Sequence, residues 1–80
     1  MHTQFYIPQV LITNHKEVRG QGDSYKVIEE GYGIYPMDEE IQVKKSEDGR
    51  PYAIGKINKL EWENNQTILT FSLVKLLGVN

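Results

Sequence analysis

The chain has 80 residues, no cysteine, and nine basic against eleven acidic side chains, which give a formal net charge of −2. This length allows one domain over residues 1–80, and the lack of cysteine excludes disulfides and cysteine-based zinc sites, so hydrophobic packing must stabilise the fold. The small negative charge excludes a general attraction to nucleic acid or to an anionic membrane.

A first strand is predicted over residues 3–13. This segment is dense in β-branched and aromatic side chains and contains no Ala, Glu or Lys. Pro8 lacks the N–H that a central strand donates, so the strand should lie at a sheet edge or be interrupted there, with firmer pairing from Gln9 onward. Residues 14–30 follow with turn-like and glycine-containing sequence, and they are the only place where a short helical turn remains possible.

Residues 25–35 are predicted to form one sharply bent strand or two short ones. Gly31 and Gly33 bracket Tyr32. Two glycines would each cost a helix about 1 kcal/mol, whereas in a strand they mark a bulge or a bend. They serve one of two purposes: they let the strand turn a corner, or they keep a sheet edge open for a partner peptide beside Tyr32 and Tyr35.

A half-buried strand is predicted at residues 40–44, where Ile41 and Val43 alternate with polar side chains. The turn-forming sequence Ser-Glu-Asp-Gly-Arg-Pro follows at residues 46–51 and reverses the chain.

The clearest prediction is a hairpin formed by residues 52–62 and 67–74. Asn64 and Asn65 are expected at its corner, because a tight turn that matches strand twist requires positive φ at both central residues, which Asn tolerates. This register places Leu60 opposite Leu69 and Trp62 opposite Thr67, with Phe71 next along the same face. A shift of the corner by one residue would leave the same side chains on one face.

The apolar phase changes within both hairpin strands. In the first, a one-residue bulge near Asn58 and Lys59 would return nearly all apolar side chains to one face. In the second, the phase shifts before Val74. Two such shifts predict strands that bend from one layer to another. We therefore expect an all-β fold, a small five-stranded antiparallel barrel or curled sheet of the SH3-like or OB-like kind, with at most one short helical turn.

Charges are distributed unevenly along the chain. Residues 23–40 carry six carboxylates and one lysine, whereas residues 41–60 carry five basic and two acidic side chains. If strands from these segments lie side by side, their charges form cross-strand pairs on a solvated face more often than a ligand site.

The tyrosines suggest a candidate binding face, because small barrels bind peptides or single-stranded nucleic acid through exposed rings flanked by cations. Core packing is the alternative, and Trp62, in phase with Leu60, is expected to cap the core. Tyr32 and Tyr35 are expected to be partly exposed. The candidate face comprises Tyr32, Tyr35, Tyr52, Lys44, Lys45 and Arg50.

Motifs for catalysis, metals or cofactors are absent from the sequence. His2 and His15 have no metal-ligand spacing, and the carboxylates at 38–40 lack the glycine and terminal Glu of a calcium loop. The serines have no elbow motif, and Gly20 and Gly22 are not followed by a third glycine and a helix. We expect no catalytic residue, no metal, no cofactor and no enzymatic activity.

Two segments resemble a known family. The sequence Glu-Gly-Tyr-Gly-Ile-Tyr-Pro-Met-Asp at residues 30–38 and the sequence Lys-Leu-Glu-Trp-Glu-Asn-Asn-Gln-Thr at residues 59–67 are similar to an uncharacterised family of short proteins from low-GC Gram-positive bacteria, catalogued as domain of unknown function number 2584. The similarity covers about the last 55 residues. It implies a bacterial cytosolic setting and carries over no catalytic or binding residues.

The leading hypothesis is a non-enzymatic protein-binding or adaptor module, monomeric or weakly dimeric. The alternative is single-stranded nucleic-acid binding by basic residues of the 41–60 segment, and it requires that these cations share a face with exposed rings. Nucleic acid is disfavoured as a partner because eleven acids offset the cations. Residues 1–4 lack the pattern of a signal peptide, and the most apolar segment, 68–77, is interrupted by polar side chains, so we expect a cytoplasmic protein with no membrane association.

Overall fold

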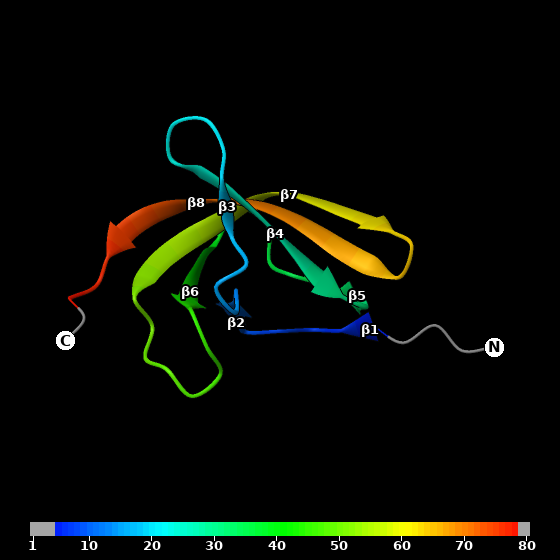
Figure 1. Cartoon of the computed structure of the whole chain (residues 1–80), viewed down its shortest axis with the longest axis horizontal. Coiled ribbons are helices and arrows are strands. Elements are labelled where there is room, and N and C mark those ends of the chain that lie inside the picture. Colours follow the sequence, from blue (N-terminus) through cyan, green and yellow to red (C-terminus); the bar gives the residue numbers. More distant parts are fainter. Residues whose placement is uncertain (1–4, 79–80) are drawn as a thin grey trace.

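The computed structural model describes residues 5–78, which form β-strands and no helix (Figure 1). The all-β prediction is confirmed, and residues 14–30 hold strands rather than a helical turn. The strands are β1 (Phe5–Tyr6), β2 (Val10–Ile12), β3 (Val18–Arg19), β4 (Ser24–Glu30), β5 (Tyr32–Gly33), β6 (Glu40–Lys44), β7 (Ala53–Glu63) and β8 (Gln66–Leu76).

Six strands form one sheet in the order β2-β6-β7-β8-β4-β3, and β1 and β5 form a separate two-stranded ribbon. The pairs from β6 through β3 are antiparallel, whereas β2 pairs with β6 and β1 pairs with β5 in parallel. The interruption predicted at Pro8 is present, since it separates β1 from β2 and lets each join a different sheet.

The large sheet must curl because its two edge strands are joined by a short connection. In a flat six-stranded sheet, the edges would lie about 24 Å apart. The six Cα steps from Ile12 at the end of β2 to Val18 at the start of β3 span at most about 21 Å. Among residues 5–78, β2 and β3 do not pair with each other. The curled-sheet form of the prediction is therefore confirmed, without closure into a barrel.

The β7–β8 hairpin has the predicted register. Asn64 and Asn65 have φ values of 53° and 62°. Leu60 lies opposite Leu69 and Trp62 lies opposite Thr67. Positive φ at both corner residues gives the turn the twist of the flanking strands, and this local signal was sufficient to fix the pairing.

Two bulges let the long hairpin bend over the core. The register shifts between Ile57 and Lys59, which leaves Asn58 as the extra residue. It shifts again where Ile54 pairs with Lys75 and Gly55 with Leu73, so Val74 is the extra residue on β8. Both shifts were predicted from the apolar phase. The resulting coiled strands arch across the molecule (Figure 1).

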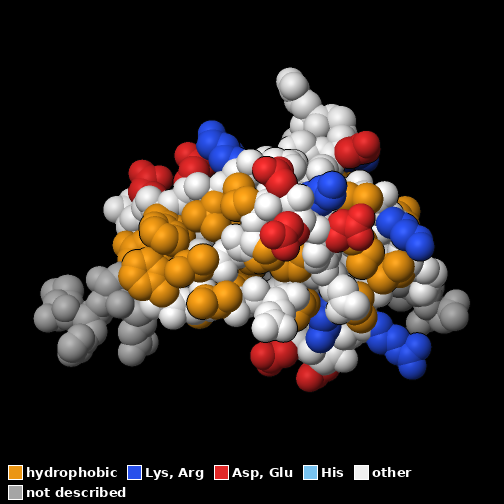
Figure 2. Space-filling model, turned by 180° about the vertical axis from the view of Figure 1, so that it is seen from behind, with side chains coloured by type: hydrophobic (Ala, Val, Ile, Leu, Met, Phe, Trp, Pro, Cys, Tyr) orange, Lys and Arg blue, Asp and Glu red, His pale blue; other side chains and the backbone are white. Residues whose placement is uncertain are grey.

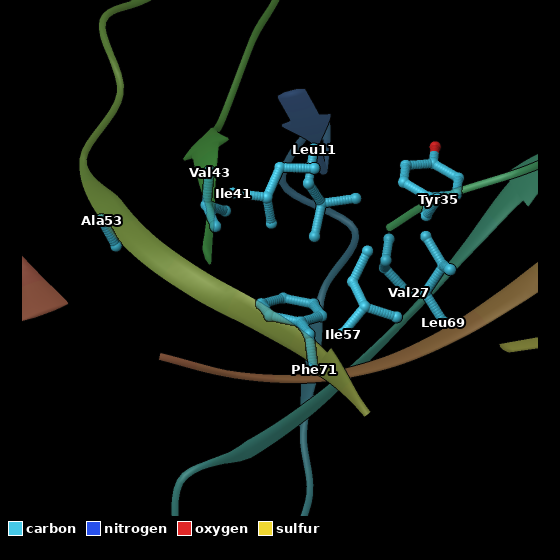
Figure 3. Packing of buried hydrophobic residues seen from close by; sticks show 9 residues of the cluster. All are labelled: Leu11, Val27, Tyr35, Ile41, Val43, Ala53, Ile57, Leu69 and Phe71. Carbon is cyan, nitrogen blue, oxygen red and sulfur yellow. The ribbon is translucent and has the colours of Figure 1, made fainter. Parts of the chain in front are cut away.

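The core lies inside this arch and draws on most of the strands of the large sheet (Figure 3). Phe71 is fully buried and its ring stacks on Tyr25, with the ring centroids 5.7 Å apart. The buried hydrophobic residues are Leu11, Val27, Tyr35, Ile41, Val43, Ala53, Ile57, Leu69 and Phe71. Among the described residues there is no helix that could span a membrane.

Candidate functional site

The six residues of the predicted binding face do not share one surface. Tyr35 is only 6% exposed and packs in the core, which contradicts its expected partial exposure. Burial, followed by the neighbouring Tyr6 and Glu29, raises the pKa of its phenol, so the ring stays neutral. Tyr35 follows β5, which contacts β8, and this contact between distant parts of the chain has no local signal in the sequence.

Tyr32 and Tyr52 lie at opposite ends of the hairpin. The hydroxyl of Tyr32 accepts a hydrogen bond from the backbone N–H of Asn65, at the corner. Tyr52 directly precedes β7 and pairs with Val43 and Leu77 through backbone hydrogen bonds. Since β7 has 11 residues, about 30 Å separates its two ends. A single ligand of peptide-segment size would have to span that distance to contact both rings.

Trp62 belongs to a surface aromatic cluster with Phe5 and Tyr32. Their ring centroids lie 5.2 to 6.0 Å apart. Trp62 is 46% exposed, so the expectation that it caps the core is wrong. The pairing of β6 with β7 ends at Lys56, so among residues 5–78 the outer half of β7 pairs only with β8. The rings of Phe5 in β1 and Tyr32 in β5 pack against Trp62 there. Seen from behind, hydrophobic side chains gather over this end of the molecule (Figure 2).

The aromatic cluster fixes the position of β5. The indole N–H of Trp62 donates to the carbonyl of Gly33 over 3.0 Å. The hydroxyl of Thr67 donates to the carbonyl of Gly31 over 2.6 Å and accepts from the N–H of Gly33 over 2.8 Å. Every one of these contacts satisfies a polar group within the chain. The cluster therefore has a structural role that explains its presence.

Of the two glycines in the 31–33 segment, Gly31 lets the backbone turn a corner and Gly33 lets two rings pack closely. Gly31 has a φ of 80°, which a side chain rarely adopts. A Cβ on Gly33 would lie 2.6 Å from the ring of Tyr35 and 2.8 Å from the ring of Tyr6. The space beside these glycines is filled by the protein's own rings, so the geometry favours the corner over an edge kept open for a partner.

Tyr52, Lys45 and Arg50 do come together at the other end. They line a hollow of about 480 Å³ with His15, Leu76 and Leu77. The ammonium of Lys45 lies 4.9 Å from the centroid of the Tyr52 ring and 3.6 Å from a carboxylate oxygen of Glu17. Lys44 is held by its own turn, where its ammonium donates to the carbonyl of Glu47. We call this hollow the Tyr52 pocket.

Glu17 is a member of this region that the sequence did not indicate. It lies in the connection between β2 and β3, with a side chain 13% exposed. Burial would raise its pKa, but the polar groups of Thr13 and of its own backbone, together with the charge of Lys45, outweigh burial and leave the pKa lowered. No signal in the chain marked this residue, because its partner Lys45 comes from the turn after β6.

A second hollow lies on β3 and β4, and its lining is apolar and basic. Val18 is 66% exposed and Ile28 is 48% exposed. The lining contains no Asp or Glu, and the hollow has a volume of about 550 Å³. We call it the basic apolar groove; it is lined by Lys16, Val18, Arg19, Gly20, Lys26, Val27 and Ile28.

The register of β4 explains why Ile28 faces outward. Val27 pairs with Leu69 and is buried, so the alternation of side chains along a strand directs its neighbours Lys26 and Ile28 to the opposite face. Val18 pairs with Lys26 and joins them there. The alternation of Tyr25 and Val27 was predicted from the sequence, but the pairing with β3 that brings Val18 alongside was not.

The backbone edge at Ile28 is also unpaired. The N–H of Gly31 donates to the carbonyl of Asn65 across the β4–β8 pairing. In an antiparallel pair, successive residues direct their backbone groups alternately toward and away from the partner strand, so those of Ile28 point away from β8. Pairing between β3 and β4 ends at Val18 and Lys26. Within residues 5–78, Ile28 therefore leaves an N–H and a carbonyl at the edge of the sheet beside the groove.

No group of three or more His, Cys, Asp or Glu side chains that could hold a metal ion occurs among the described residues.

Comparison with known proteins places these features in a family. The model of a family described as "Domain of unknown function (DUF2584)" matches residues 1–80. The uncharacterized protein YtmB of Bacillus subtilis is 34% identical over 71 residues, which cover 89% of this chain and 89% of that protein. The X-ray crystal structure of ytmB from Bacillus subtilis resembles this chain with a TM-score of 0.92 and 30% identity, covering 100% of this chain and 99% of that chain. The resemblance seen in the sequence is confirmed.

Proposed function

This chain belongs to the family described as a domain of unknown function (DUF2584), and for this member we propose a non-enzymatic role as a protein-binding module. One observation carries the proposal: exposed Val18 and Ile28 line the basic apolar groove, whose charged residues are all basic. The partner is a segment of another protein that carries apolar and acidic side chains. The module acts in the cytoplasm as a monomer or weak dimer, and a chain without cysteine is compatible with that reducing compartment.

The apolar lining supplies affinity. Val18 and Ile28 expose more than a third of their surface, and covering such side chains contributes about 25 cal/mol for each Å² removed from water. The groove is small compared with a standard interface, which buries about 800 Å² on each partner. We therefore expect a transient contact with a Kd on the order of 10 to 100 μM.

The basic residues supply selectivity. Lys16, Arg19 and Lys26 line the groove. Their charges attract carboxylates and repel other cations, so they steer association and reject basic segments. The unpaired backbone edge at Ile28 offers in addition the hydrogen bonds that an extended partner strand would use.

The test uses a synthetic peptide in which leucine alternates with glutamate, and a matched peptide in which lysine replaces glutamate. In a ¹⁵N NMR titration, the acidic peptide should shift the amide signals of residues 18–19 and 26–28, with an affinity that falls as salt rises. The lysine peptide and a single-stranded oligonucleotide should leave these signals unchanged.

Variants locate the contact. Ile28→Ser and Arg19→Gln should each weaken binding of the acidic peptide several-fold. Ile34→Ser and Lys59→Gln are matched controls, because Ile34 is similarly exposed at 42% and Lys59 lies on β7, and both should bind as the parent does. If the shifts map to the aromatic cluster, or if Ile28→Ser binds normally, the groove is not the binding site.

A further inference from the structure

We infer that the Tyr52 pocket binds a small amphipathic carboxylate, with an aliphatic chain against its apolar wall and the carboxylate on Arg50. This site is separate from the basic apolar groove, and none of its lining residues belongs to that groove. Its volume of about 480 Å³ lies within the range of about 300 to 1,000 Å³ typical of small-ligand sites.

The apolar wall is built by the end of β8 where it lies beside the start of β7. Leu76 is 70% exposed and Leu77 is half-buried. The N–H of Leu77 donates to the carbonyl of Tyr52 over 2.9 Å, which fixes this wall relative to the ring. Side chains so exposed, and facing a hollow, gain stability when an apolar chain covers them.

The cationic side of the pocket has one charge without a counterpart. Lys45 pairs with Glu17 at 3.6 Å, which balances its charge. Arg50 lines the same pocket and forms no ion pair with a carboxylate among residues 5–78. The guanidinium of Arg50 can therefore hold one carboxylate through two parallel hydrogen bonds. The net charge of this side of the pocket fits a ligand with a single negative charge.

The position of Lys45 decides between kinds of anionic ligand. Its ammonium lies over one face of the Tyr52 ring, so a nucleotide base cannot stack on that face. An aliphatic chain needs no free ring face, because contact with Leu76 and Leu77 is sufficient for it. The pocket thus favours an aliphatic carboxylate over a nucleic acid.

The test is a ¹⁵N NMR titration of the full chain with octanoate, and with octanol as the uncharged probe of equal chain length. Octanoate should shift the signals of Arg50, Tyr52, Leu76 and Leu77 and saturate with a Kd on the order of 0.1 to 1 mM, as expected for about ten heavy atoms in an open pocket. Octanol should bind about tenfold more weakly, because it cannot form the charge-assisted pair.

Two surface variants and one control complete the experiment. Arg50→Gln should weaken octanoate about tenfold without changing octanol, and Leu76→Ser should weaken both. Lys59→Gln, on β7 and outside the lining of both hollows, should leave both affinities unchanged. Equal affinity for octanoate and octanol, or normal octanoate binding by Arg50→Gln, would overturn the inference. Shifts spread over the Phe5, Tyr32 and Trp62 cluster would also overturn it, since they would indicate general hydrophobic adsorption.

Discussion

At the scale of single residues, two aromatic side chains on the hairpin have the same phase but different surroundings. Phe71 has no exposed surface, whereas Trp62 is 46% exposed. The alternation of side chains reports which face of a strand a residue occupies. It does not report how far along that face the covering layer extends, so the sequence assigned both rings to the core.

We predict that Phe71→Ala destabilises the fold by about 3 to 5 kcal/mol, because it leaves a cavity in a small core. Trp62→Ala should cost only about 1 to 2 kcal/mol, since its ring is half in water and the Gly33 carbonyl that it leaves can be hydrated. Urea unfolding followed by circular dichroism measures both. Equal losses for the two variants would mean that the aromatic cluster is as important as the core.

At the scale of elements, the two-residue strand β5 is held in place by contacts with other strands. It pairs with β1, receives a hydrogen bond from Trp62, and donates one from the N–H of Gly33 to the hydroxyl of Thr67 on β8. That hydroxyl in turn donates to the carbonyl of Gly31, just before β5. The absence of a side chain at Gly33 lets the rings of Tyr6 and Tyr35 approach.

Gly33→Ala should therefore destabilise the protein by about 1 to 3 kcal/mol, as overpacking does when neighbouring rings must shift. Gly20→Ala is the matched control, because a Cβ there lies 3.5 Å or more from its neighbours and the change should stay within about 0.5 kcal/mol. Urea midpoints and the ring signals of Tyr6 and Tyr35 report the effect. Equal midpoints for the two variants would show that the rings adapt without cost.

Sequence patterns predicted the local structure but not the contacts between residues that are far apart in the chain. Asn64 and Asn65 fixed the hairpin register, and the phase shifts located both bulges. The parallel pairs of β1 with β5 and of β2 with β6 depend on where the chain returns after long excursions, which no short pattern encodes. Neither hollow was predicted as such, since each combines side chains from separate strands or turns.

At the scale of the whole molecule, Glu17 and Lys45 join the connection between the two sheet edges to the turn after β6. The pKa of Glu17 is lowered in the fold, so this residue contributes stability above its ordinary pKa and loses it as pH falls through the folded-state value. Glu29 behaves oppositely. Burial raises its pKa against the opposing charge of Lys16, so its contribution is present at low pH and is lost as pH rises through the folded-state value.

We therefore expect Glu17→Gln to lower stability at pH 7, and Glu29→Gln to raise it. At pH 3, where carboxyl groups of ordinary pKa are protonated, both effects should shrink. Glu61→Gln is the control, because Glu61 forms an exposed pair with Lys59 at 3.9 Å and should matter little at either pH. Urea midpoints of the three variants at both pH values measure these effects. An unchanged midpoint for Glu17→Gln at pH 7 would show that the Glu17–Lys45 pair does not contribute to stability.

The strand order also sets when the chain can fold during synthesis. β4 pairs with β8 along its whole length, and within residues 5–78 the only other strand beside it is the two-residue β3. Ribosomes add about 5 to 20 residues each second, so roughly 2 to 8 s pass between translation of Val27 and translation of its partner Leu69. Throughout that interval the apolar side chains of β4 are present in the nascent chain, but its pairing partner β8 has not yet been made. Folding must therefore wait for the last hairpin, and the N-terminal half has no native state of its own while it emerges.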